Sequence, residues 1–502
     1  MFALVLHSHL PWLANHGRWP VGEEWLYQSW AGSYLPLTDM LTALADEGRT
    51  HLLTLGITPV LAAQLDDPHC LSGMHHWLAN WQLRAHEATD RDLSSREHRS
   101  AAHALATFET RWRHGGSPVL RPLVDAGTVE MLGGPLAHPF QPLMDERLRE
   151  FSLSEGLADA RMRLGTRPNG IWAPECAYAP GMERGYADAG VTHFMVDGPA
   201  LRGDTSLGRP VRDSAVVAFG RDLDVSYRVW SPKSGYPGHS AYRDFHTYDH
   251  ATGLKHARVT GRGVESADKA PYDPEAASAA IDKHVTDFVD TVRRRLRSES
   301  DRIGRPALVV AAFDTELFGH WWFEGPVWLE RVLRALPEAG IDVGTLADAR
   351  ARGFVGTRVD LPMSSWGSGK DWRVWNGKAV QDLVDLNSEV TATALDAIDK
   401  NRDHSFGRPE LRNRVNDQMV RETLNTIASD WAFMVSKDSA AEYARQRAHV
   451  HAHALREIAD AVERGRAGRA AELAEQWNRA DGLFPALDAR RLRTDRPFGG
   501  ER

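Results

Sequence analysis

Two carboxylates stand directly after runs of apolar residues, at positions where a buried strand would end. Glu175 follows the run 170–173 and lies close to Trp172, and Asp314 follows the run 307–313, the most hydrophobic stretch in the chain. An acid beside an aromatic side chain at a strand end is better placed for catalysis than for stabilising a fold. The alternative for either residue alone is a helix cap or a partner for an arginine.

Such a pair is what cleavage of a glycosidic bond with retention of configuration requires. One carboxylate attacks the anomeric carbon, while the other protonates the leaving oxygen and then activates the acceptor. In known sites of this kind the two groups lie about 5–5.5 Å apart. The sequence therefore predicts a retaining glycosidase-type reaction on Glu175 and Asp314, provided that the fold brings them together.

Three histidines at the ends of apolar runs support a rival hypothesis. His7 and His9 follow the first run, and His138 follows another. A His-x-His pair on a barrel strand is a common start of a zinc site, which would make the protein a metal-dependent hydrolase with Asp314 as a further ligand. The neighbouring side chains are prolines and aromatics rather than additional carboxylates, and this favours binding of sugar hydroxyls instead.

The chain contains 17 tryptophans in 502 residues. An indole offers a flat apolar face and one donor, which suits the CH face of a sugar ring as well as a protein core. Three tryptophans fall within the Gly- and Ser-containing segment 364–376, and Asp430 and Trp431 follow in a helical pattern. We expect a sugar-stacking rim here, with a tryptophan-rich domain junction as the alternative.

Short apolar runs alternate with helical patterns over some 350 residues. The runs occupy 2–6, 51–55, 128–132, 170–173, 193–196 and 307–313, and the helical patterns occupy 35–45, 146–164, 274–296 and 327–336. Continuous runs of this length are typical of strands buried on both faces of a parallel sheet. The alternation predicts an α/β barrel whose function gathers at the carboxyl ends of the strands.

We expect additions to this barrel, which itself would comprise 1–65 and 121–362. The polar, helix-prone segment 66–120 is too long for a simple connection and predicts a helical insertion. The Gly- and Pro-rich segment 199–273, with β-like pieces such as 224–230, predicts an excursion that carries a mobile loop.

The last part of the chain lacks strand patterns. Helices are predicted at 380–400, 410–435, 440–464 and 470–477, giving an all-helical C-terminal domain over 363–488. The Arg- and Gly-rich end, 489–502, is expected to form a flexible tail.

Composition disfavours several classes of protein. The net charge of -8 argues against a nucleic-acid partner, and no stretch approaches the roughly 20 apolar residues of a membrane span. The opening residues lack a basic leader, and the only two cysteines, Cys70 and Cys176, cannot form a disulfide framework or a thiolate metal cage, so we expect a cytoplasmic protein. Neither a phosphate-binding glycine loop nor a serine elbow is present, which leaves nucleotide-dependent glycosyl transfer without support.

Two motifs carry a resemblance to a known family. WAPEC at 172–176 and FDTELFGHWW at 313–322 resemble the sites of the nucleophile and of the acid/base in glycoside hydrolase family 57, most closely in its α-glucan branching enzymes. The likeness extends from HSHLP at 7–11 to LFPALD at 483–488. It implies an incomplete (β/α)7 barrel with a helical insertion and an all-helical C-terminal domain.

The resemblance also implies roles for individual residues. Glu175 would be the nucleophile and Asp314 the acid/base, and Tyr236 would be the lid-loop tyrosine that favours transfer over hydrolysis. The other implied substrate-binding residues are His7, His9, His138, Trp172, His320, Trp321, Trp366, Trp375, Asp430 and Trp431. No metal or other cofactor is implied. The implied activity is formation of α-1,6 branches on an amylose- or glycogen-like α-glucan.

Several alternatives remain open on the sequence. An α-amylase or a 4-α-glucanotransferase of the same family would use the same two carboxylates, because the motifs specify the bond that is cut better than the acceptor. More distant alternatives are the metal-dependent hydrolase and a glucan-binding protein without catalysis, for which Glu175 would be dispensable.

Overall fold

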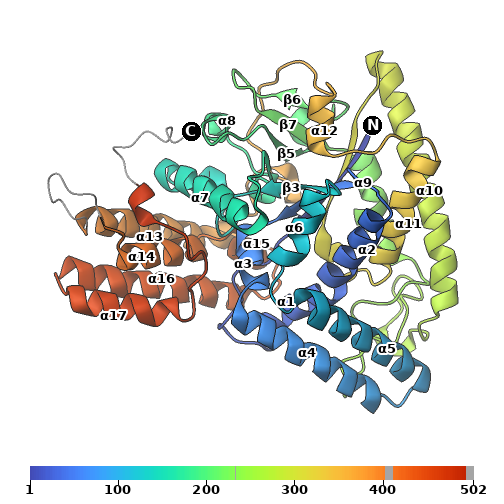
Figure 1. Cartoon of the computed structure of the whole chain (residues 1–502), viewed down its shortest axis with the longest axis horizontal. Helices are drawn as coiled ribbons and strands as arrows, with labels where there is room; N and C mark the ends of the chain where they lie inside the picture. The colour runs from blue at the N-terminus through green and yellow to red at the C-terminus, as the bar shows by residue number, and fades with distance from the viewer. Residues whose placement is uncertain (232, 402–410, 493–502) are drawn as a thin grey trace.

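The computed structural model describes residues 1–231, 233–401 and 411–492. In the view of Figure 1, a sheet surrounded by helices occupies the centre and right, and a bundle of C-terminal helices lies beside it on the left. The predicted incomplete α/β barrel with a helical C-terminal domain is confirmed.

The barrel is a single sheet with the strand order β6-β7-β5-β4-β3-β2-β1-β8. The strands are β1 Phe2–Ser8, β2 Leu53–Ile57, β3 Val129–Gly133, β4 Gly170–Ile171, β5 His193–Asp197, β6 Arg209–Pro210, β7 Val217–Arg221 and β8 Val309–Asp314. All pairings are parallel except that of the two-residue strand β6 with β7. Asp222 N donates to Val310 O at 2.8 Å between β7 and β8, but the two strands form no ladder, so the barrel of seven parallel strands stays open there.

Each of the six predicted apolar runs overlaps a strand, but the β-like piece predicted at 224–230 in the excursion 199–273 is wrong. That segment supplies β7 to the sheet, and its β-like piece is the helix α9, Leu223–Trp230. The side chain of Asp222 caps α9 by accepting a hydrogen bond from Val225 N, and Val225 and Val229 face the core one turn apart. A capped helix with one apolar face is therefore preferred over the strand that its valines suggest.

Helices cover the outside of the sheet. They are α1 Glu23–Ser29, α2 Leu35–Asp46, α3 Pro59–Leu65, α6 Ser117–Asp125, α7 Glu146–Leu164, α8 Met182–Asp188, α9, α10 Pro274–Ile303, α11 Gly325–Glu338 and α12 Leu346–Ala351. In α11, Trp328, Val332 and Leu336 recur at helical spacing and are buried against the sheet, which is why this segment forms a surface helix. A five-residue π turn, Trp30–Tyr34, links α1 to α2.

The segment between β2 and β3 carries two long helices, α4 Pro68–Glu87 and α5 Arg91–Thr107. Asp67 and Asp90 cap their N-termini through side-chain hydrogen bonds. The two helices lie along the lower edge of the molecule in Figure 1, to the right of the C-terminal bundle.

The C-terminal domain consists of α13 Gln381–Lys400, α14 Arg414–Thr426, α15 Ser429–Ser436, α16 Ala441–Glu463 and α17 Ala467–Asn478. The single helix predicted over 410–435 is wrong, because the described part of it is divided into α14 and α15. Ala428 is extended and forms a β-bridge with Pro139, while Ser429 N donates to His138 O at 3.1 Å. This break turns the first residues of α15 toward the barrel.

The predicted flexible tail is partly wrong. Residues 489–492 are packed: Leu492 is fully buried and its carbonyl oxygen accepts a hydrogen bond from Arg147. The rest of that segment, 493–502, lies outside the described residues. None of the helices in the described ranges combines the length and the apolar character that a membrane span requires.

Candidate active site

The carboxyl ends of β1, β4 and β8 meet beside α15. β1 pairs with β8 in a register that places His7 opposite Asp314. Glu175 lies in a 3-10 turn after β4 and has φ 61° and ψ 18°, a left-handed conformation that is uncommon for a residue with a side chain. Trp366 N donates to Glu175 O at 2.8 Å and helps to hold this turn. Such conformations cluster at active sites, where the surrounding structure maintains them.

Two donors from the C-terminal part of the chain hold the Glu175 carboxylate. Ser429 Oγ donates to Oε1 and Trp366 Nε1 donates to Oε2, each at 2.8 Å. Burial raises the pKa of Glu175 to about 7, while the hydrogen bonds from Trp366 and Ser429 act in the opposite direction. The carboxyl is therefore about half ionised at neutral pH, and its two donors stabilise the ionised form.

A chain of hydrogen bonds leads from β1 to Glu175. His7 Nε2 lies 3.2 Å from His138 Nε2, and His138 Nδ1 lies 2.9 Å from Ser429 Oγ. Burial lowers the pKa of both histidines well below the usual range, so both are neutral. A neutral imidazole has one donor and one acceptor. We therefore infer that His7 donates to His138, His138 donates to Ser429, and the serine hydroxyl donates to Glu175.

Aromatic rings form one wall of the site. Trp172 stacks on His7 with a centroid distance of 4.3 Å, and Trp366 meets Trp172 edge-on at 5.0 Å. Behind Trp366, the guanidinium of Arg221 lies 5.3 Å from its ring centroid and pairs with Asp197 at 2.8 Å. The indole of Trp366, which donates to Glu175, is thus held in place by its contact with Trp172 and by Arg221, which is itself fixed by a buried ion pair.

Asp314 has the environment of a group that stays protonated. Burial raises the pKa of Asp314 well above its usual range, and the nearby carboxyls of Glu316 and Glu175 raise it further by like-charge repulsion. Glu175 and Asp314 are therefore close enough to influence each other electrostatically. A nucleophile needs an ionised carboxylate, which the two donors to Glu175 favour, and an acid needs a protonated carboxyl, which the burial of Asp314 favours.

Sequence reasoning missed Glu316, Tyr34 and Ser429. Glu316 is buried and accepts hydrogen bonds from the Tyr34 hydroxyl and, at 3.1 Å, from His9 N. Burial raises the pKa of Glu316 to about 7. The signal for Glu316 was present, since it stands two residues after Asp314, whereas Tyr34 carried none and Ser429 was marked only by its neighbour Asp430.

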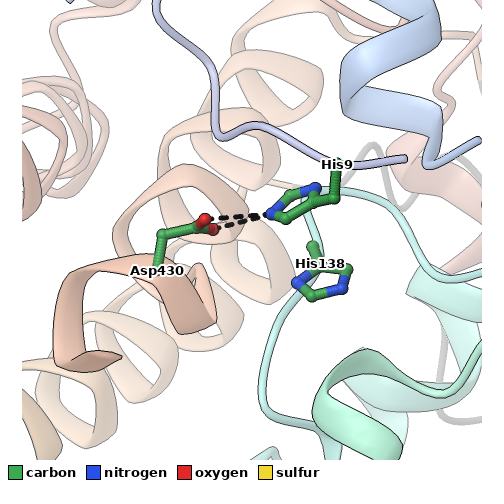
Figure 2. Close-up of side chains that lie close together, drawn as sticks. All are labelled: His9, His138 and Asp430. Carbon is green, nitrogen blue, oxygen red and sulfur yellow. Dashed lines mark hydrogen bonds and ion pairs between the residues drawn. The ribbon is translucent and has the colours of Figure 1, made fainter. Parts of the chain in front are cut away.

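Figure 2 shows His9, His138 and Asp430, which come from the two domains. His9 Nε2 lies 3.0 Å from both carboxylate oxygens of Asp430, and His9 Nδ1 lies 3.0 Å from Thr58 Oγ1. The rings of His9 and His138 stack at 3.7 Å. These three groups are close enough together to hold a metal ion. Both ring nitrogens of each histidine already have hydrogen-bond partners, however, so a metal would have to displace them.

Two tryptophans predicted to line the glucan cleft are buried by protein. Trp375 is 2 % exposed, stacks on Phe140 at 4.7 Å and donates from Nε1 to Ser429 O at 3.2 Å. Trp431 is also 2 % exposed and donates to Asn425 O at 2.8 Å. Neither ring has a free face for a sugar, because both fill the junction between the barrel and the C-terminal domain. Trp375 instead positions the backbone of Ser429.

The other predicted residues do not contact the Glu175 carboxylate. Tyr236 is 5 % exposed, donates to Asp287 on α10 at 2.5 Å and stacks on His284 at 4.2 Å. The expectation of a lid tyrosine over the carboxylates does not fit this packed position. His320 and Trp321 lie on the loop after Asp314 and line a separate cavity beyond Glu316.

Comparison with known proteins agrees with this geometry. Residues 3–355 match the family described as Glycosyl hydrolase family 57, and residues 388–492 match the domain described as 1,4-alpha-glucan branching enzyme, C-terminal. A probable 1,4-alpha-glucan branching enzyme of Mycobacterium tuberculosis (strain ATCC 25618 / H37Rv) is 70% identical over 514 residues, which cover 98% of each chain.

Two solved structures are similar over the whole chain. A family 57 branching enzyme of Thermococcus kodakaraensis, in complex with glucose and additives, superposes with a TM-score of 0.92 at 29% identity and covers 100% of this chain and 98% of that one. The α-amylase AmyC of Thermotoga maritima has a TM-score of 0.84 at 24% identity, covers 99% of each chain, and shows the shared fold alone. On this evidence the chain belongs to glycosyl hydrolase family 57.

Proposed function

We propose that the protein is a 1,4-α-glucan branching enzyme, which cuts an α-1,4-glucosidic bond by retaining double displacement and rejoins the piece through an α-1,6 bond. The similarity to a probable branching enzyme over 98% of the chain supports this function. The observation that carries the mechanism is the contrast between two buried carboxyls, Glu175 with two donors and Asp314 with neighbouring acids.

In the first step, the Glu175 carboxylate attacks the anomeric carbon of the donor glucan. The bond from this carbon to the glycosidic oxygen breaks, and Asp314 gives its proton to that oxygen, so that the cut chain leaves with a hydroxyl. Ser429 and Trp366 hold the attacking carboxylate at the required place. The product is a glucosyl ester on Glu175 and an ionised Asp314.

In the second step, the Asp314 carboxylate takes the proton of a 6-hydroxyl on the acceptor glucan. The hydroxyl oxygen attacks the anomeric carbon, the ester bond to Glu175 breaks, and an α-1,6 branch forms while both carboxyls return to their starting states. Water that reaches the ester instead gives hydrolysis, so exclusion of water decides the outcome.

Residues around the carboxylates are assigned to the sugar that occupies the cleft. His9 and Asp430 are 11% and 14% exposed, and their polar atoms offer hydrogen bonds to sugar hydroxyls. Trp366 is partly exposed and is the aromatic platform beside the nucleophile. No metal has a role in this mechanism.

The substrate is proposed to be an amylose- or glycogen-like α-glucan, and the place of action the cytoplasm. The net charge of -8 suits an uncharged polysaccharide better than a nucleic acid. Cys70 and Cys176 are free and buried, which is compatible with a reducing compartment.

Incubation of the purified protein with amylose tests this function. New α-1,6 anomeric protons in the NMR spectrum with few new reducing ends are expected, and Glu175→Gln and Asp314→Asn are expected to abolish both signals. Reducing ends without α-1,6 linkages would make the protein an amylase. Altered chain lengths with neither signal would make it a 4-α-glucanotransferase.

A further inference from the structure

A second cavity lies beside the catalytic loop. It has a volume of about 160 Å³. Its lining comes from four parts of the chain: residues 28–32 at the end of α1 and in the following π turn, the helices α4 and α5, the segment 243–255, and the loop 319–323. In Figure 1, α4 and α5 lie at the lower edge of the molecule, and the lining of this cavity includes neither Ser429 nor Trp366, the two donors to Glu175.

The cavity lies beside the loop that follows Asp314 and Glu316. Its residue Trp321 donates from the backbone N to Glu316 O at 3.1 Å, and Ser33 Oγ accepts from His320 N at 3.1 Å while donating to Glu316 O at 3.4 Å. Glu316 stands two residues after Asp314. The loop that lines the cavity is therefore the direct continuation of the loop that carries the acid/base.

The lining offers exposed aromatic faces. Trp321 and Phe323 are 38% and 42% exposed, and Trp81 and Phe245 contribute further rings. Large aromatic side chains that stay exposed in a concave surface are typical of a ligand site. Flat rings with polar groups around them suit the CH faces of a glucan.

Two cationic side chains at this cavity have unused hydrogen-bond donors. Lys255 Nζ lies 3.7 Å from the ring centroid of Phe245 and forms no hydrogen bond or ion pair with the described residues, although the carboxylates of Asp244 and Glu97 are near enough to act on its charge. Burial lowers the pKa of Lys255 to about 7. Arg243 pairs with Glu97 at 2.9 Å through Nη1, yet its Nε is buried and donates to no described group. A buried donor without an acceptor, such as Arg243 Nε, is unfavourable unless a ligand supplies the acceptor, and the partly exposed Lys255 Nζ is open to the same ligand.

We propose that this cavity binds the acceptor glucan, the chain whose 6-hydroxyl receives the transferred piece. The inference rests on the proposed branching function, because only transfer needs a second glucan beside the donor. Ring and hydroxyl oxygens of a glucose unit are acceptors for Lys255 and Arg243, and the CH faces of its neighbours stack on Trp321 and Phe323. The hydrogen bond from Trp321 to Glu316 places this chain next to the acid/base loop.

The test compares branching with hydrolysis in the full-length protein. Amylose is the donor at a fixed concentration, and a fluorescently labelled maltooligosaccharide is added as acceptor. Lys255→Met keeps the approximate length of a partly buried side chain that has no hydrogen bond or ion pair to a described residue, so the fold is expected to be retained. The acceptor concentration for half-maximal labelled product is expected to rise about tenfold. Hydrolysis of amylose is expected to rise rather than fall, because water competes with the acceptor for the glucosyl ester.

Two further variants sharpen the result. Phe323→Leu removes the aromatic ring on which Arg243 stacks at 4.3 Å, leaves Lys255 unaltered, and is expected to act in the same direction. Lys283→Met makes the same chemical change on the exposed surface of α10 and is expected to leave the acceptor dependence unaltered. The proposal would be overturned if Lys255→Met and Phe323→Leu lost branching and hydrolysis in parallel. It would also be overturned if the acceptor dependence stayed unchanged in both variants.

A binding measurement separates this proposal from the proposed function. The affinity of maltoheptaose for the Glu175→Gln protein, which turns over no glucan, is compared with its affinity for Glu175→Gln combined with Lys255→Met. Weaker binding in the double variant supports the glucan site even if the wild-type chain forms no branches. Equal affinity in the two proteins contradicts it.

Discussion

Replacing Ser429 with alanine is expected to shift the pH dependence of glucan cleavage. The serine hydroxyl donates to Glu175 Oε1 at 2.8 Å and stabilises the ionised carboxylate against burial. A hydrogen bond to a charged group contributes about 1.5–3 kcal/mol, and one pKa unit corresponds to about 1.4 kcal/mol. The pKa of Glu175, about 7 in the wild type, should therefore rise by about one to two units.

The size of the effect depends on pH, because only the ionised carboxylate attacks. At pH 7 the ionised fraction falls from about a half to about a tenth or less, so cleavage should slow at least about fivefold. At pH 9 the ratio of variant to wild type should recover to within about twofold of unity. Ionisation of Asp314 lowers the rates of both proteins at high pH, so the ratio of the two rates is compared rather than either rate alone.

The assay is the initial rate of amylose cleavage between pH 5 and pH 9, expressed as kcat/KM. Ser436→Ala on the same helix is the matched control, since the hydroxyl of Ser436 donates to Val374 O rather than to Glu175. Ser429→Thr keeps a hydroxyl and should retain the wild-type acid limb. A ratio that stays constant over the whole range for Ser429→Ala would refute the electrostatic role and leave only a positional one.

Three further outcomes are expected. The pKa of Glu175 is raised from 4.5 to about 7 in the folded protein, so ionisation of this carboxyl lowers stability as pH rises through this range. Glu175→Gln should therefore raise the free energy of unfolding by up to about 3 kcal/mol at pH 8 and leave it unchanged at pH 4. Thermal unfolding at the two pH values measures this difference. Trp375→Ala should lower the free energy of unfolding in urea by about 3–5 kcal/mol, whereas weaker glucan binding at unchanged stability would make Trp375 a binding platform. EDTA should leave cleavage unchanged, and loss of activity that zinc restores would favour a metal at His9, His138 and Asp430.

Local patterns in the sequence were sufficient to place the two carboxylates at strand ends. The run before Asp314 is strand β8, and the run before Glu175 contains β4, because continuous apolar stretches of this length are buried wherever they occur in a parallel sheet. Helix α7 has the predicted bounds, since Asp145 caps its start and Gly165 in the left-handed conformation ends it. These features depend on residues close together in the chain.

The partners of the carboxylates depended on tertiary structure. Ser429 and Trp366 reach Glu175 from 254 and 191 residues away, and the break between α14 and α15 that aims Ser429 is maintained by a bridge to Pro139. No local pattern specifies such distant contacts, because they arise from the packing of one domain against another.

Burial likewise decided which aromatic residues face a ligand. Trp375 and Tyr236 have the residue types of sugar-binding side chains, yet one fills the domain junction and the other packs on α10. The sequence by itself determined the family and the barrel, and it placed the two carboxylates of the proposed mechanism at strand ends. Only the tertiary structure decided the pKa of each carboxyl and the faces left open to glucan, because both depend on what surrounds a side chain in space.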